Sequence, residues 1–165
     1  MVSERFVKVG IAPVALLTFL ASVITLAIAA SLESHWLDVG FPNKSYRDRE
    51  RVLLTAGIVG TLVSAYSLVG AFFFADRLAF GIFFHLIAFT ITFLLALIGS
   101  ASLTALTDKI DCGDVDWSRC NITKGLVAIG WIETIFAFII LIMVLVLGIK
   151  SRSGVGMRKG ALTDA

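Results

Sequence analysis

Two ionisable side chains stand inside long apolar runs of this sequence, and they are the first candidates for chemistry. Glu133 is the only charged residue in the run 125–149, and His85 is the only ionisable residue in the run 78–106. An acid near the centre of a bilayer costs about 3 kcal/mol, so such a residue is a candidate for function by default. From their places in the two runs, we expect their heights in the bilayer to differ by about 8–10 Å. The two residues therefore fit either a proton relay or two separate polar contacts that each hold neighbouring helices together. The expected separation favours two separate contacts.

The two cysteines of the chain, Cys112 and Cys120, lie eight positions apart in the polar segment 107–124. This placement is typical of a disulfide formed in an oxidising compartment. A membrane thiol oxidoreductase would need a Cys-x-x-Cys pair and a shuttle pair, and nothing in the segment activates a thiolate, so we expect a structural disulfide. Asn121 begins an Asn-x-Thr sequon in the same segment and is a candidate for glycosylation, although it lies close to the membrane.

The same segment carries four aspartates, which are Asp108, Asp111, Asp114 and Asp116. Their spacing does not follow a calcium-binding EF-hand loop, so we interpret them as a solvated acidic loop. An alternative is that the loop faces the charged run at residues 47–51 and pairs with its arginines. The chain contains no nucleotide-binding loop, zinc-protease motif or nucleophile elbow. We therefore predict that the protein is not an enzyme and has no catalytic, metal-binding or cofactor-binding residues, although a bound lipid or sterol is compatible with the sequence.

The elements that position these residues are indicated by composition. Of the 165 residues, 58% are apolar and 16% are charged, whereas soluble domains average about 45–50% and 25%. Four runs, approximately 9–32, 52–75, 78–106 and 125–149, are long enough to cross a bilayer as helices. We predict an all-α, integral membrane four-helix bundle over residues 1–149, followed by a basic tail over residues 150–165. The 14 basic residues are nearly balanced by 12 acidic ones, so the sequence has no overall positive charge of the kind that binds nucleic acid.

The orientation of the bundle follows from the cysteines and the sequon, because the basic residues divide equally between the two sides. Both features place segment 107–124 outside the cell or in a lumen, so both termini are expected in the cytosol. The membrane would then be the plasma membrane or one of the secretory pathway. Basic residues of the tail are candidates for contact with anionic lipid headgroups. They are Lys150, Arg152, Arg158 and Lys159.

Small residues recur at helical spacing on the predicted spans, as is typical of closely packed membrane helices. Helix packing within one bundle and an oligomer interface are both compatible with these stripes, and the former is the more common use. The candidate packing residues are Gly57, Gly60, Ser64, Gly70, Ala88, Thr92, Ala96, Gly130 and Thr134.

Three features together resemble fungal MARVEL-domain proteins. They are the Tyr-Arg-Asp-Arg-Glu-Arg run at 46–51 that leads into the second span, the cysteine pair before the fourth span, and the run 124–133 that opens it. The third span departs from the expected pattern, because it is rich in His and Phe and lacks a tryptophan. The resemblance implies an organiser of membrane domains or vesicle traffic, with no catalytic residues.

From the residues and the resemblance together, we expect a non-enzymatic four-span scaffold. Its partners would be membrane lipids and other integral membrane proteins or further copies of itself. Two alternatives remain. One is an accessory subunit of a larger membrane complex. The other is a small proton-coupled transporter or channel that uses Glu133 and His85.

Overall fold

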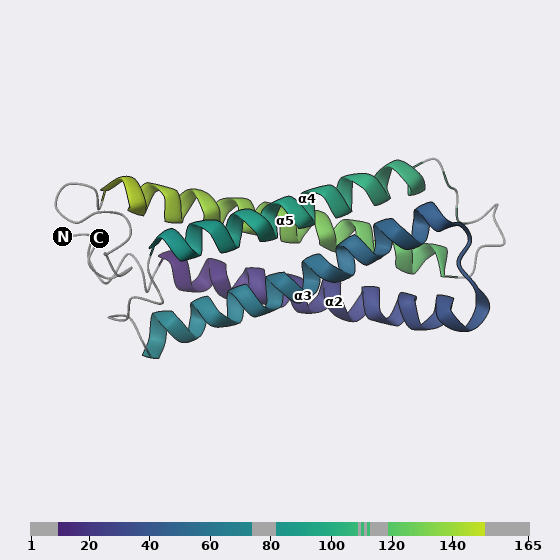
Figure 1. Ribbon diagram of the computed structural model, residues 1–165, viewed down its shortest axis with the longest axis horizontal. Coiled ribbons are helices and arrows are strands. Elements are labelled where there is room, and N and C mark those ends of the chain that lie inside the picture. Colours follow the sequence, from purple (N-terminus) through teal and green to yellow (C-terminus); the bar gives the residue numbers. More distant parts are fainter. Residues whose placement is uncertain (1–9, 74–81, 109, 111, 113–118, 151–165) are drawn as a thin grey trace.

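The computed structural model describes residues 10–73, 82–108, 110, 112 and 119–150 of the chain. These residues form four long helices, which are α2 (Ala12–Val39), α3 (Lys44–Phe73), α4 (Ile82–Thr107) and α5 (Cys120–Lys150). The helices pack side by side into one elongated bundle (Figure 1). The predicted all-α four-helix bundle is therefore confirmed.

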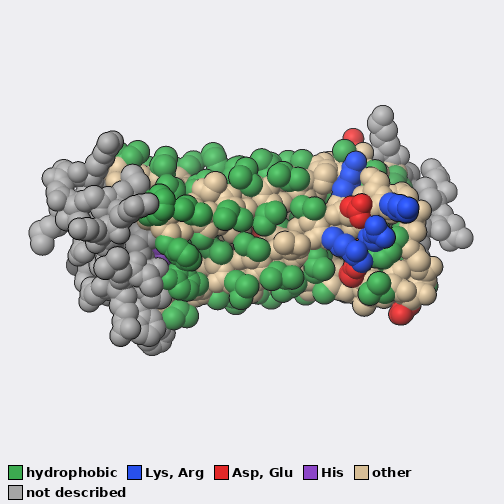
Figure 2. All heavy atoms as spheres, viewed as in Figure 1, with side chains coloured by type: hydrophobic (Ala, Val, Ile, Leu, Met, Phe, Trp, Pro, Cys, Tyr) green, Lys and Arg blue, Asp and Glu red, His purple; other side chains and the backbone are tan. Residues whose placement is uncertain are grey.

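All four helices are long and apolar enough to cross a membrane. The candidate spans are Ala12–Val39, Lys44–Gly70, Phe83–Thr107 and Cys120–Ile149. Apolar side chains cover the middle of the bundle surface, and charged side chains gather near one end (Figure 2). Because lipid can solvate such an apolar surface and water cannot, the protein is an integral membrane protein.

Each helix packs against two neighbours, in the order α2–α3–α4–α5 and back to α2. Consecutive helices run in opposite directions, so the start of α2 and the end of α5 lie at the same end of the bundle (Figure 1). The opposite end carries the disulfide between Cys112 and Cys120, and we call it the disulfide end. The packing closes into a ring whose centre all four helices share.

The residues that face this centre follow alternating steps of three and four along every helix. On α2 they run from Ala15 through Ser22 and Ala29 to Trp36. The same spacing connects Tyr46 to Ser67 on α3, His85 to Leu103 on α4, and Thr123 to Leu147 on α5. A repeat of seven residues with two core positions is the pattern of left-handed helix bundles. This repeat explains how four helices with nearly parallel axes stay in contact over their whole length.

Three helices extend beyond the predicted spans at the disulfide end. The first two predicted spans are separated by residues 33–51, but only residues 40–43 lie between α2 and α3. Gly40 ends α2 with a φ of 90°, which glycine adopts without strain. The side chain of Asn43 begins α3, because its Oδ1 accepts a hydrogen bond of 2.7 Å from the Tyr46 backbone N–H. Hydropathy detects the part of a helix that lies in lipid, so it misses turns that project into water.

The core divides into two apolar clusters. One contains Phe89, Ile140 and Val144, and the other, nearer the disulfide end, contains Leu53, Leu103 and Leu126. The seven-residue repeat places small and polar residues between them. They are Ser22, Thr25, Gly60, Ser64, Thr92, Ala96, Glu133 and Thr134, and we call them the polar layer.

Candidate functional site

Glu133 occupies the polar layer and is completely buried. Ser22 on α2 donates a hydrogen bond of 2.8 Å to Oε1 of this carboxyl group on α5. A buried polar group is costly unless it is hydrogen-bonded, and such bonds between membrane helices contribute about 0.6 kcal/mol on average. The bond therefore connects α2 and α5 at mid-bundle.

Gly60 on α3 completes this junction. A Cβ atom added at Gly60 would lie 2.6 Å from Glu133 Oε1 and would also collide with Ser22 Oγ. Any side chain at this position would force the Ser22 hydroxyl group or the Glu133 carboxyl group to move. The junction of Ser22, Gly60 and Glu133 thus joins α2, α3 and α5.

Several polar atoms of the polar layer have no hydrogen-bond partner among the described residues. By strict geometry they include the second carboxyl oxygen of Glu133 and the hydroxyl groups of Thr25 and Ser64, which lie on three different helices, although the Thr25 hydroxyl group interacts with the Glu133 carboxyl group. By contrast, Thr92 and Thr134 donate to the carbonyl oxygens of Ala88 and Gly130 in their own helices. The layer therefore has unused hydrogen-bonding capacity in a region where lipid offers none.

His85 belongs to a different cluster, near the end of the bundle where α2 begins. It is buried, and its ring lies among the aromatic rings of Tyr66, Phe84 and Phe89, with centroids 6.0, 6.3 and 6.4 Å away. The described surroundings of His85 are therefore mainly aromatic.

The register of α4 and α5 places His85 farther from Glu133 than expected. Gly130 lies level with Ser100, because a Cβ at Gly130 would sit 2.6 Å from Ser100 Oγ. From this register His85 and Glu133 are about twelve helical residues apart, or about 18 Å along the bundle. The expected 8–10 Å was wrong, because span boundaries read from hydropathy do not fix the relative height of two helices.

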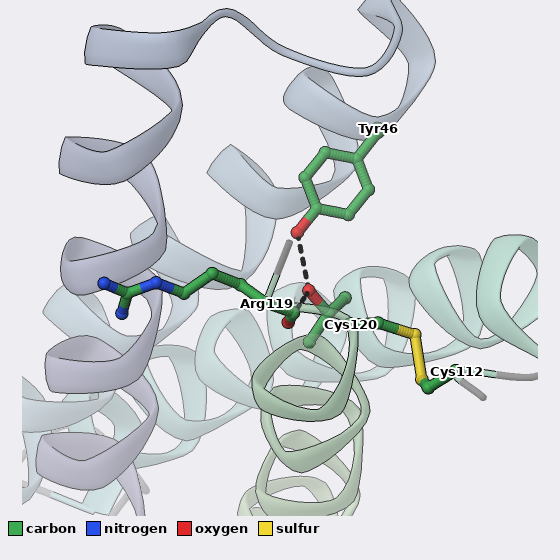
Figure 3. The surroundings of a disulfide bond; sticks show 5 residues. Tyr46, Cys112, Arg119 and Cys120 are labelled. Atoms are coloured by element: carbon green, nitrogen blue, oxygen red, sulfur yellow. Dashed lines mark hydrogen bonds between the residues drawn. A yellow bond between two sulfur atoms is a disulfide. The ribbon is translucent and has the colours of Figure 1, made fainter. Parts of the chain in front are cut away.

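At the disulfide end, Tyr46 on α3 reaches the first turn of α5 (Figure 3). Its hydroxyl group lies 2.9 Å from the Thr123 hydroxyl, and both residues are buried. Thr123 also donates to the carbonyl oxygen of Arg119, which has a positive φ of 69° just before the helix. The expected disulfide is present beside this contact, with the Cα atoms of Cys112 and Cys120 5.7 Å apart.

Sequence reasoning missed Glu50, which is as completely buried as Glu133. Neither of its carboxyl oxygens makes a hydrogen bond of good geometry with a described residue, but the carboxyl group interacts with Glu33, Tyr46 and Arg51. The sequence places Glu50 in a charged run that reads as solvent-exposed. Its spacing of four from Tyr46 and three from Leu53 was the signal, because this spacing puts it on the buried face of α3.

The arginines near Glu50 contact described residues of α2, α3 and α4. Arg51 pairs with Glu33 on α2 at 2.6 Å, and Arg49 donates to the carbonyl oxygen of Ser102 on α4 at 2.7 Å. Arg47 contacts its neighbour Asp48 at 3.2 Å. Three of the four loop aspartates, at 111, 114 and 116, lie outside the described residues.

The other candidate residues fall in three groups. Gly57, Gly60, Ser64, Gly70, Thr92, Ala96, Gly130 and Thr134 are buried in the bundle, and Ala88 is half-buried. Asn121 is exposed in the first turn of α5. Lys150 is the last residue of α5, and Arg152, Arg158 and Lys159 lie outside the described residues.

No three His, Cys, Asp or Glu side chains of the described ranges are close enough together to hold a metal ion.

In comparisons with known proteins, no family model, curated protein or solved structure matches this chain. Its class rests on its own architecture: it is a protein with four candidate membrane-spanning helices.

Proposed function

We propose that the protein is a non-enzymatic membrane organiser that associates laterally with lipids and with other integral membrane proteins. The observation that carries this proposal is the division of its surface. Polar side chains such as Ser22 and Glu133 bind one another inside the ring, while large apolar side chains on all four helices point outward. Lateral contact is the interaction that such a surface offers along most of its length.

The resemblance to MARVEL-domain proteins supports the same proposal and suggests a role in membrane domains or vesicle traffic. The disulfide supports an orientation in which segment 107–124 lies outside the cell or in a lumen and both termini lie in the cytosol. We place the protein in the plasma membrane or in a secretory-pathway membrane on this basis.

Tryptophan scanning of the outer surface would test the proposal. Leu20, Leu62, Ile98 and Ile135 are exposed positions, one on each helix. Each variant of the full chain would be reconstituted in lipid vesicles, and lateral association would be measured by chemical crosslinking and by energy transfer between labelled copies. If the protein is an organiser, substitution on one face should reduce association at least severalfold while the others leave it unchanged. A chain that stays monomeric and captures neither partner proteins nor selected lipids would refute the proposal.

The same scan separates the organiser from an accessory subunit, which would purify with one partner in fixed stoichiometry. A proton-coupled transporter or channel is the other alternative, and the unpartnered oxygen of Glu133 is the observation that favours it. The separation of His85 from Glu133 gives no support to a relay through both residues. Proton flux into vesicles that falls in Glu133→Gln would favour the transporter, and equal flux in both proteins would exclude it.

A further inference from the structure

A recess of about 240 Å³ lies between the last turn of α4 and the first turns of α5, at the disulfide end. Among the described residues, its lining combines one acid, one base, two hydroxyl groups and two small apolar residues. The lining residues are Thr104, Thr107, Asp108, Lys124, Val127 and Ala128. We infer that this recess binds the headgroup of a zwitterionic phospholipid with a primary ammonium group, of which phosphatidylethanolamine is the common example.

The two charges of the recess are available to a ligand. Asp108 and Lys124 are both exposed, and among the described residues neither forms an ion pair, with the other or with a third group. Neither charge stabilises its own helix. Asp108 follows the C-terminal end of α4 and Lys124 lies just past the first turn of α5, whereas helix dipoles favour the opposite signs at these ends.

The helix ends add to the same charge separation. The C-terminal end of α4 carries partial negative charge beside Asp108, and the N-terminal end of α5 carries partial positive charge near Lys124. A ligand with an ammonium group at one side and a phosphate group at the other would match both ends. A ligand with a single charge would match one end and leave the other unpaired.

The hydroxyl groups favour an ammonium group that can donate hydrogen bonds. Thr107 already donates its own proton to the carbonyl oxygen of Leu103 at 3.0 Å, so its oxygen can only accept. The Thr104 hydroxyl group donates to the carbonyl oxygen of Ser100 and accepts from the indole N–H of Trp131 at 3.0 Å. Asp108 and Thr107 therefore provide acceptors, which a primary ammonium group can use and a choline group, which has no N–H, cannot.

The seam between α4 and α5 continues below the recess as an apolar surface. Trp131 is exposed beside the recess, and farther along the seam Phe93 and Phe138 lie in contact with ring centroids 5.4 Å apart. From Lys124 to Phe138 this seam extends about 21 Å along α5, a length that an acyl chain can follow. This surface identifies the source of the headgroup as a membrane lipid and not a soluble phosphoethanolamine compound.

The inference rests on the proposed organiser function, because it names the lipid class with which the protein would associate. The full chain in detergent would be mixed with phosphatidylethanolamine, phosphatidylcholine or phosphatidylglycerol of equal acyl chains, and bound lipid would be counted by native mass spectrometry. We expect phosphatidylethanolamine to be retained at least about fivefold more than the other two, as for one charged hydrogen bond in a partly exposed site.

The two charges make different contributions, which separate variants reveal. Asp108→Asn should abolish the preference for phosphatidylethanolamine and leave phosphatidylglycerol binding intact, because it removes the negative charge that pairs with the ammonium group. Lys124→Gln should weaken the binding of all three lipids, because each carries a phosphate group. Lys44→Gln and Asp48→Asn are matched controls: both residues are exposed at the same end and neither lines the recess. Helical circular dichroism and an intact disulfide would establish that each variant is folded.

Three results would overturn the inference. They are equal retention of the three lipids, retention that Asp108→Asn and Lys124→Gln leave unchanged, and competition by soluble glycerophosphoethanolamine at the concentration of the lipid. Any of them would leave the organiser function intact provided that the tryptophan scan still identifies an association face. The loss of that face with lipid preference retained would instead refute the organiser function alone.

Discussion

Gly60 on α3 lies directly against the carboxyl group of Glu133 on α5, so that a single added methyl group would come within 2.6 Å of Oε1. This contact explains why a carboxyl group is accommodated at the centre of a membrane bundle. The missing side chain of one helix makes room for the polar side chain of another, and Ser22 on a third helix then donates a hydrogen bond to it. Burial, space and hydrogen bonding thus depend on three residues that are far apart in the sequence.

We predict that Gly60→Ala lowers the free energy of unfolding by about 1–3 kcal/mol, because overpacking forces Ser22 or Glu133 to move. Thermal unfolding in detergent micelles, followed by circular dichroism, would measure the change. Gly125→Ala is the matched control, because nothing lies within 4 Å of its added Cβ, and it should be neutral or slightly stabilising. Adding Ser22→Ala to Gly60→Ala should recover part of the loss. If Gly60→Ala behaves like Gly125→Ala, the junction is not tightly packed.

The Tyr46–Thr123 contact should behave as one hydrogen bond between α3 and α5. We expect Tyr46→Phe to cost about 1 kcal/mol, because both hydroxyl groups are buried. A double-mutant cycle with Thr123→Val would isolate the contact, and the combined loss should be smaller than the sum of the single losses. Strictly additive losses would mean that the two hydroxyl groups stabilise the protein independently.

Glu50 gives a prediction of the opposite sign. Because its carboxyl group is completely buried and makes no hydrogen bond of good geometry with a described residue, Glu50→Met should raise the free energy of unfolding by about 1–3 kcal/mol. Asp48→Met, at an exposed position two residues earlier, should change it by less than about 0.5 kcal/mol. Thermal unfolding of the two variants in the same micelles would test the difference. A destabilised Glu50→Met would indicate that the carboxyl group binds a partner that stabilises the folded protein.

The distance between His85 and Glu133 predicts that they act independently. Single substitutions His85→Phe and Glu133→Gln and the double substitution should change stability additively, to within about 0.5 kcal/mol, because the two sites are about 18 Å apart along the bundle. Unfolding of the four proteins under one condition provides this cycle. A coupling energy above about 1 kcal/mol would indicate a connection between the two clusters that their separation of about 18 Å does not suggest.

The sequence predicted the fold class and the disulfide because both depend on local signals, namely apolar run length and two cysteines in one polar segment. It did not predict the lengths of α2, α3 and α5, since the turns outside the lipid are polar and have no hydropathy signal. The burial of Glu50 was missed for a related reason. Arg49 and Arg51 make its neighbourhood look exposed, while its core position appears only in the three-and-four spacing. The partner of Glu133 could not be predicted, because Ser22 is 111 positions away and only the register of the packed helices joins them.

The bond between Tyr46 and Thr123 also bears on when Asn121 can be modified. Thr123 is the third residue of the sequon, and in the folded bundle its hydroxyl group is buried and engaged. A glycosyltransferase that must recognise this threonine can therefore act only before α3 and α5 come together. A sugar chain on Asn121 would therefore mark molecules in which the first turn of α5 was accessible to the transferase before α3 packed against it.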